Sequence, residues 1–345
     1  MVRLSSLLKK GLADTSDFHF AVGAHPMMRV AGRLKRCGEE LITDDQMRAF
    51  LNEIIPREKR SEMYAKGIDL SLEFDGASFR TNVYQDRRGV AVALRVIPRA
   101  VRTLSELGLP EVVQEIAYKK RGLVLVSGIA GSGKTTTLAA LIDKINRERA
   151  AHIITIEDPI EYLHENKNSL INQREVGTHA TSFADALRAA LREDPDVIML
   201  GEMRDLETIA TAITAAETGH LVLGSIHTRG ASQTVDRMID VFSADQQDQI
   251  RAQLADALEM VVSQVLVPSK DGTRRYLAYE IMTATYAIKS LIRDKKTYQI
   301  PSTIETGKSV GMQMLDKSLI SLVEGNFVTM QDVQPWILDK DLIRK

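Results

Sequence analysis

The sequence predicts an α/β protein with two domains, a small N-terminal α+β domain and a larger domain built on a mostly parallel sheet. Three observations predict this division. Short strand-like runs dominate residues 17–99, buried strands alternate with helices after residue 105, and a phosphate-binding loop follows one of those strands. A chain of 345 residues is long enough for each domain to bury its own core.

The N-terminal domain is expected to span residues 1–99, followed by a linker at 100–105 and by the second domain, with a helical C-terminal region, at 106–345. Its strand-like runs are Phe18 to Phe20, Met27 to Val30, Ile68 to Phe74, Ser78 to Tyr84 and Val90 to Ile97. Two helices interrupt these runs. A capping box from Thr43 to Gln46 begins the first, and the second is expected to begin at Pro56 and to end at Gly67.

Residues 128–135 read GIAGSGKT, a complete G-x-x-x-x-G-K-[ST] phosphate loop, directly after the apolar run 123–126. Glycines let the loop point backbone N–H groups at phosphate oxygens, and the helix beginning near Lys134 adds its positive dipole end. Lys134 is expected to reach the β- and γ-phosphates, and Thr135 to hold Mg²⁺. The residues expected to bind the nucleotide are Gly128, Ile129, Ala130, Gly131, Ser132, Gly133, Lys134, Thr135 and Thr136.

The composition limits the other functions that the chain could have. Its 45 basic and 46 acidic residues nearly cancel, which disfavours a protein that tracks along nucleic acid. A single cysteine, Cys37, excludes a disulfide framework and a C-x-x-C zinc ribbon. The N-terminus lacks an apolar signal region and no run approaches eighteen apolar residues, so we expect a soluble intracellular protein with only peripheral membrane contact.

Reactive side chains follow three predicted strands of the second domain, at the end where open α/β sheets bind ligands. They are Glu157, Asp158 and Glu161 after residues 152–156, Glu202 after 197–200, and His227 after 221–226, with His220 just before that last strand. Carboxylates in such positions are often solvated turn residues or helix caps. Three such clusters behind one phosphate loop favour a catalytic site.

Phosphoryl transfer to water requires an anchored triphosphate, a metal, a group that activates the water, and positive charge near the transition state. Glu202 is the expected catalytic base, since it follows an apolar strand and a glycine. The acidic cluster at 157–161 is expected to order the water shell of the metal or to assist the base. His227 is expected to contact the γ-phosphate. His220 follows the predicted helix over 205–218, so a capping role is an equal alternative.

Several longer segments carry a resemblance to a known family. EDPIEY at 157–162, NQREVG at 172–177, ALRAALREDPDVIMLGEMRD at 186–205 and TGHLVLGSIHT at 218–228 resemble, in order and spacing, the Asp box, Walker B region and His box of secretion and type IV pilus motor ATPases. FRTNVYQDRRGVAVALRVIP at 79–98 and RRYLAYEIMTATYAIKSLIRD at 274–294 extend the match. The chain is similar to PilT-like twitching-motility (retraction) ATPases, of the type II/IV secretion ATPase superfamily, over nearly its whole length.

The resemblance implies a RecA-like P-loop ATPase domain, a PAS-like N-terminal domain, ATP and Mg²⁺ as ligands, and a homo-hexamer. It also carries two arginines of the N-terminal domain onto Arg80 and Arg95, which would approach the triphosphate. Strand spacing independently allows a hairpin at 86–89 to place both on one edge of a sheet, although spacing alone leaves them as surface arginines.

The implied function is that of a hexameric motor which drives type IV pilus retraction at the inner face of the cytoplasmic membrane. Its expected partners are a pilus-base or inner-membrane platform protein and a paralogous motor, with no nucleic acid. A pilus-assembly or type II secretion extension ATPase, a DNA translocase and a non-catalytic nucleotide-sensing regulator remain alternatives. The short length, the single cysteine and the AIKSLIRD segment at 287–294 favour retraction.

The retraction family usually has Pro-Thr and then Ser where this loop has Ile129, Ala130 and Thr135, so we expect altered kinetics but not an inactive protein.

The predicted helix over 287–293 gathers apolar side chains around Ile288 on one side. That side is either a partner-binding face or an ordinary face against the core.

Overall fold

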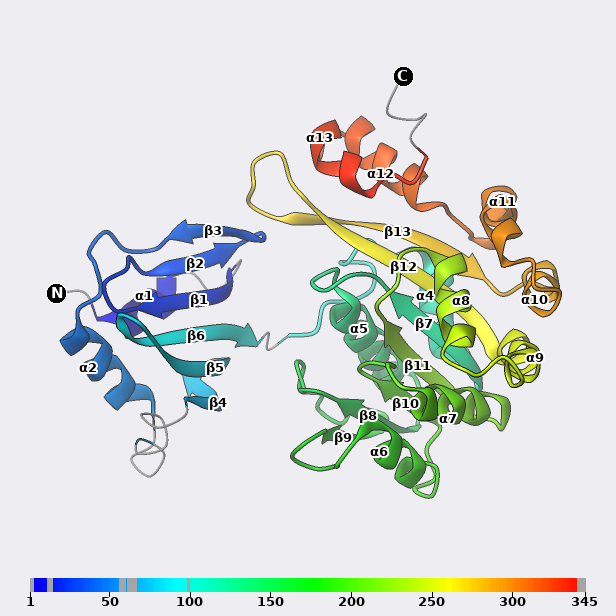
Figure 1. Cartoon of the computed structure of the whole chain (residues 1–345), viewed down its shortest axis with the longest axis horizontal. Helices are drawn as coiled ribbons and strands as arrows, with labels where there is room; N and C mark the ends of the chain where they lie inside the picture. The colour runs from blue at the N-terminus through cyan, green and yellow to red at the C-terminus, as the bar shows by residue number, and fades with distance from the viewer. Residues whose placement is uncertain (1–2, 11–14, 56–59, 61–66, 98–99, 340–345) are drawn as a thin grey trace. The chain divides into compact units, whose positions relative to one another are not determined.

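The computed structural model describes residues 3–10, 15–55, 60, 67–97 and 100–339 (Figure 1). Its contacts divide the chain into two compact units. The first comprises residues 1–100 and 268–275, and the second comprises residues 101–267 and 276–345. The first unit therefore includes a short segment that is distant in sequence.

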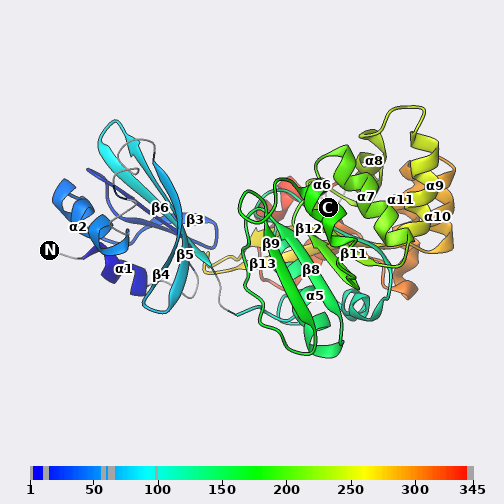
Figure 2. The same cartoon turned by 90° about the horizontal axis from the view of Figure 1, so that it is seen from below.

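The described part of the first unit is one antiparallel sheet covered by helices. Its elements are α1 (Leu4–Lys10), β1 (Thr15–Ala21), β2 (Met27–Val30), β3 (Arg33–Arg36), α2 (Asp44–Ile54), β4 (Ile68–Phe74), β5 (Ala77–Asp86) and β6 (Gly89–Ile97). The strand order is β3-β2-β1-β6-β5-β4. Helices α1 and α2 lie on the same face of this sheet (Figure 2). Alternate strand residues such as Phe18, Phe20 and Phe79 share a buried core with Met47 and Phe50 of α2.

The first unit confirms most of the elements that the sequence predicts. Strand β4 has the predicted bounds, and α2 begins at the predicted capping box, in which Gln46 N–H donates to Thr43 Oγ1 at 3.2 Å. Strand β3 was not predicted, because its residues Arg33–Arg36 are all exposed and show no apolar alternation. The helix expected between Pro56 and Gly67 lies mostly outside the described residues.

The second unit is built on a seven-stranded sheet with the order β13-β12-β7-β11-β10-β8-β9. Its strands are β7 (Gly122–Ser127), β8 (His152–Glu157), β9 (Leu170–Glu175), β10 (Val197–Leu200), β11 (Leu221–Ile226), β12 (Leu258–Pro268) and β13 (Arg275–Thr283). The pairings of β12 with β7, β7 with β11, β11 with β10, β10 with β8 and β8 with β9 are all parallel. Strands β12, β11, β10, β8 and β9 therefore run in the same direction as β7 and end at the same edge of the sheet.

Helices cover both faces of this sheet. They are α4 (Glu111–Gln114), η2 (Glu115–Tyr118), α5 (Lys134–Glu148), α6 (Phe183–Ala190), α7 (Leu206–Glu217), α8 (Ala231–Asp240), α9 (Gln247–Ala257), α10 (Tyr286–Arg293), η3 (Thr297–Gln299), α11 (Ile300–Thr306), η4 (Gly307–Val310), α12 (Leu315–Glu324), α13 (Met330–Val333) and η5 (Gln334–Trp336). Val124 and Val126 of β7 pack toward α5, whereas Leu123 and Leu125 pack toward α6 to α11. Both faces of β7 are thus buried, which explains its continuous apolar run.

The helical C-terminal region packs against the β12–β13 hairpin. Val265 and Val267 of β12 share a core with Leu315 and Leu319 of α12. In α10, Ile288 and its neighbours on the predicted apolar side are buried against the core, so that side is not a partner-binding face. Among the described residues, no helix combines the length and the apolar composition that a bilayer crossing requires.

Candidate nucleotide site

The phosphate loop connects β7 to α5 at the edge where the parallel strands end. Gly128, Gly131 and Gly133 all have positive φ, and Gly133 caps α5 at φ 92°. A Cβ on Gly128 would lie 2.4 Å from Ser132 Oγ and 2.5 Å from the carbonyl oxygen of Gln264. The glycine at 128 is therefore required for close packing of the loop as well as for its backbone conformation.

Lys134 is the charged centre of the loop. Its side chain is only 8% exposed, and Nζ donates to the carbonyl oxygens of Gly128 and Ile129 at 2.8 and 3.1 Å. Burial lowers the pKa of Lys134, while the charges of Glu202 and Glu161 raise it. Because Ile129 contributes its backbone carbonyl here, this contact does not depend on the side chain that departs from the family pattern.

The residues of the loop fit an anionic ligand. The Ser132 hydroxyl is buried and has no hydrogen-bond partner among the described residues. Thr135, half-buried, and Thr136 lie in the first turn of α5, where backbone N–H groups lack helical acceptors. A triphosphate oxygen would supply the acceptor that Ser132 lacks, and the Thr135 hydroxyl is of the kind that holds Mg²⁺.

A brace from a distant strand fixes the loop. The buried side chain of Gln264 on β12 donates from Nε2 to the Ser132 carbonyl at 2.9 Å and accepts from Thr137 Oγ1 at 3.0 Å. These contacts join the loop, α5 and β12 in one network. No sequence motif singled out Gln264, because the contact spans more than a hundred residues of chain.

The three predicted carboxylates after β8 have different environments. Glu157 is 3% exposed and accepts from Thr155 Oγ1 at 2.7 Å and from Gln173 Nε2 at 3.0 Å. Burial raises the pKa of Glu157, although these hydrogen bonds lower it in part. Asp158 is exposed, and Glu161 is half-buried and close enough to raise the pKa of Lys134. Of the three carboxylates, Glu161 is thus the one whose charge acts on Lys134 of the phosphate loop.

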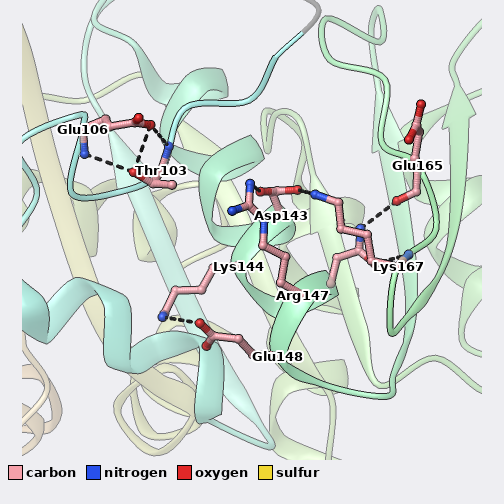
Figure 3. Close-up of polar contacts among 9 residues, drawn as sticks. Thr103, Glu106, Asp143, Lys144, Arg147, Glu148, Glu165 and Lys167 are labelled. Carbon is pink, nitrogen blue, oxygen red and sulfur yellow. Dashed lines mark hydrogen bonds and ion pairs between the residues drawn. The ribbon is translucent and has the colours of Figure 1, made fainter.

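The segment after β8 is anchored along α5 at two places. Near the phosphate loop, the Thr136 and Tyr162 hydroxyls lie 2.9 Å apart. At the far end of α5, Asn146 Nδ2 donates to the Glu165 carbonyl at 2.8 Å, and Lys167 pairs with Asp143 (Figure 3). This second network was not anticipated from the sequence. Together the two sets of contacts hold residues 162–167 along α5.

Glu202 and His227 meet at the ends of the adjacent strands β10 and β11. His227 Nε2 lies 3.2 Å from Glu202 Oε1, and Arg204 Nε donates to the same oxygen. Burial and the Lys134 charge lower the pKa of His227 below its usual 6.5, against the opposing effect of Glu202. A neutral imidazole is therefore favoured at neutral pH beside a carboxylate whose side chain is 19% exposed.

His220 lies at the other end of β11. Its Nδ1 is 3.0 Å from the Ala215 carbonyl oxygen of α7, and its own carbonyl accepts from Gly122 N–H at 3.0 Å. The six residues of β11 separate it from His227, roughly 20 Å of extended strand. The structure thus does not bring His220 to the site within this chain. Its contact with α7 agrees with the capping alternative, and its catalytic role stays a prediction.

Arg80 and Arg95 of the first unit lie directly opposite each other on β5 and β6, and both are exposed. β5 and β6 are neighbouring interior strands, so the two arginines lie within the sheet. The prediction that they lie at one edge of the sheet was wrong. Arg95 Nε donates to Asp17 Oδ1 at 3.0 Å, and Arg29 Nε lies 3.8 Å from Oδ2. The structure brings the two arginines together, and their role at a triphosphate stays a prediction.

Comparisons with known proteins agree with this arrangement. A family model described as type II/IV secretion system protein matches residues 64–318. A Pseudomonas aeruginosa protein named type IV pilus retractation ATPase PilT is 46% identical over 321 residues, which cover 92% of this chain and 93% of that protein. A Neisseria gonorrhoeae twitching motility protein is 45% identical over 327 residues, 94% of this chain and 87% of that protein.

A solved structure extends the agreement to three dimensions. The crystal structure of the pilus retraction motor PilT with bound ADP superposes on this chain with a TM-score of 0.85 and a sequence identity of 41%. The match covers 100% of this chain and 99% of that chain. The predicted fold class, a RecA-like P-loop ATPase domain with a small N-terminal α+β domain, is thereby confirmed.

Proposed function

We infer the function of this chain from the premise that it belongs to the type II/IV secretion system protein family. It is an ATPase of the pilus-retraction kind, which uses ATP hydrolysis to remove pilin subunits from a type IV pilus. The observation that carries this inference is the convergence of Lys134, Glu161, Glu202 and His227 on one sheet edge. A site that only bound nucleotide would not require a carboxylate and a neutral imidazole beside the phosphate loop.

Each residue has a role that follows from its surroundings. The loop N–H groups and Lys134 hold the β- and γ-phosphates, because Lys134 is already aimed into the loop. Glu202 accepts the proton of the attacking water, and His227 lies beside it to contact the γ-phosphate. Arg204 Nε donates to the Glu202 carboxylate, and this pairing raises the pKa of Arg204. Glu161 faces Lys134 and is suited to order water near the phosphates.

Magnesium completes the proposal. Thr135 at the start of α5 would hold the ion together with phosphate oxygens, and Mg²⁺ when bound neutralises charge on the triphosphate. Among the described residues, no group of three or more His, Cys, Asp or Glu side chains could hold a metal alone. The donor set therefore favours an ion that arrives with the nucleotide.

The assembly extends the proposal beyond one chain. We propose that the chain acts as a homo-hexamer at the cytoplasmic face of the inner membrane, with a pilus-base or platform protein and a paralogous motor as partners. In this assembly Arg80 and Arg95 serve the triphosphate of a neighbouring subunit. Support comes from their paired, exposed positions and from Asp17, which holds the Arg95 guanidinium in place.

Glu202→Gln tests the catalytic part of the proposal. The amide keeps the size of the side chain but cannot take a proton, so phosphate release from ATP should fall about 10²- to 10⁴-fold while a fluorescent ATP analogue still binds. Glu324→Gln is the matched control, since it makes the same change at an exposed position on α12. A nucleotide sensor would tolerate the change at Glu202, and that outcome would refute the motor.

The direction of work is tested in cells. A deletion strain that carries excess surface pili and does not twitch supports retraction, whereas bald cells would show a pilus-assembly motor instead. Complementation with Glu202→Gln should fail in either case. Salt-sensitive DNA binding with DNA-stimulated hydrolysis by the purified protein would point to a translocase.

A further inference from the structure

The loop after β11 contacts Trp336, the only tryptophan of the chain, through the side chain of Arg229. Arg229 lies two residues after His227, and its guanidinium carbon is 5.3 Å from the centroid of the Trp336 ring. A guanidinium over an indole face is attracted by the ring quadrupole, more strongly than over other aromatic rings. Among the described residues, Trp336 is the one partner of the Arg229 side chain. This contact therefore links the C-terminal segment to the loop that carries His227.

The far end of the same loop is fixed to the sheet. Gly230 N–H donates to Ser263 Oγ on β12 at 2.9 Å, and Ala231 N–H donates to Glu280 Oε1 on β13 at 2.6 Å. Gly230 turns the chain with φ 80°. Residues 227–229 thus run between two fixed points, the end of β11 and this turn. Within this stretch the Thr228 and Thr234 hydroxyls lie 2.7 Å apart, and the Arg229 side chain adds the contact with Trp336.

Trp336 is itself firmly held. Its η5 turn packs beside the buried cluster that contains Val265, Leu319 and Val333. Just after it, the N–H groups of Leu338 and Asp339 both donate to the buried Asp316 carboxylate at 2.9 Å. Val265 directly follows Gln264, the brace of the phosphate loop. The ring is therefore a rigid support, joined through β12 to the other half of the site.

We propose that Trp336 is a positioning residue for ATP hydrolysis, which holds Arg229 and thereby fixes where His227 meets Glu202. The inference rests on the proposed ATPase function. A loop free to move would let the His227 imidazole leave its place 3.2 Å from the Glu202 carboxylate. Because the phosphate loop has its own brace, loss of the ring contact should affect turnover and leave nucleotide binding nearly unchanged.

Kinetics of the full-length chain test the proposal. Arg229→Met should lower kcat for ATP hydrolysis about fivefold and change the Kd of a fluorescent ATP analogue less than about twofold. Arg229→Lys keeps the cation and should retain at least about half of kcat, as should Trp336→Phe, which keeps an aromatic face. Arg192→Met is the matched control, because Arg192 is also exposed. Wild-type kcat in Arg229→Met would overturn the proposal.

A double variant separates positioning from a general structural role. If Trp336 acts through Arg229, then Arg229→Met combined with Trp336→Leu should be no slower than the worse single variant. Losses that multiply to about 25-fold would overturn the proposal, since the two residues would then act separately. Should Trp336→Leu fail to fold, Trp336→Phe combined with Arg229→Met serves in its place. A loss no larger than the roughly fivefold loss of Arg229→Met alone supports the proposal, and a loss of about tenfold overturns it.

Fluorescence gives a readout that is independent of hydrolysis. Trp336 is the only tryptophan, so the tryptophan emission of the chain reports the surroundings of this one ring. A non-hydrolysable ATP analogue should change the emission of the wild-type chain, and this change should be lost in Arg229→Met. An emission that ignores both nucleotide and the Arg229 substitution would overturn the proposal. If the wild type bound ATP without hydrolysing it, the proposed function would fail while this titration still decided the coupling.

Discussion

The two halves of the nucleotide site are built in different ways. The phosphate-binding half consists of buried groups, Lys134, Gln264 and Glu157, each satisfied by hydrogen bonds within the chain. The hydrolytic half consists of Glu202 and His227 with Arg204, whose side chains are 19%, 43% and 76% exposed and are held by charge. The difference indicates that buried hydrogen bonds fix the binding half, whereas the hydrolytic half depends on more exposed charged contacts.

Energetics explain why this difference should appear in experiments. A buried polar group that loses its partner costs about 1–3 kcal/mol, whereas an exposed ion pair contributes about 0–1 kcal/mol. Changes in the binding half should therefore reduce affinity and stability together. Changes in the hydrolytic half should reduce turnover and leave the fold intact.

The largest effect is expected for Lys134→Ala. The charge-assisted bonds of Lys134 to phosphate are worth about 1.5–3 kcal/mol each, so ATP affinity should fall at least about tenfold and hydrolysis should fall below detection. Phosphate release and binding of a fluorescent ATP analogue measure the two effects. Lys144→Ala, further along the same helix and paired with Glu148, is the control. Unchanged affinity in Lys134→Ala would place the phosphates elsewhere.

Removal of the loop brace should have the next largest effect. Gln264→Leu strips partners from the Ser132 carbonyl and the Thr137 hydroxyl, so the free energy of unfolding should fall by about 2 kcal/mol and ATP should bind several-fold more weakly. Urea unfolding and nucleotide titration measure these changes. Gln253→Leu, which removes a contact with Glu217 on the helical layer, should cost about 0.5 kcal/mol or less. Equal losses in both variants would remove the distinction between the halves.

The smallest effect is expected from pH, and it should be confined to the hydrolytic half. Because the pKa of His227 lies below 6.5, its imidazole is neutral at pH 7 to 8 and gains a proton only as the pH falls past that lowered value. Protonation would tighten the pair with Glu202, so kcat should decrease on acidification while ATP affinity changes less. The pH profile of His227→Asn should lack this step. A wild-type profile that rises toward acid would contradict the assignment of a neutral histidine.

Much of the site could be predicted because its residues belong to short local patterns. The phosphate loop, the strand ends at Glu157, Glu202 and His227, and the capping box of α2 each depend on neighbours within a few residues. The prediction failed at β3, which is made of exposed side chains with no apolar alternation. For α10 the sequence left two alternatives open, and the structure decided for the core, with α9 beside this helix.

The sequence by itself determined the chemistry of this protein, a phosphate loop followed by a carboxylate and a histidine at the ends of apolar strands. Only the tertiary structure decided which groups hold that chemistry in place. Gln264, Asn146 and Trp336 act across long stretches of chain, and hydrogen bonds and ring contacts of that kind leave no periodic mark in the sequence. They form only when folding brings distant strands and turns within about 3 to 6 Å of one another.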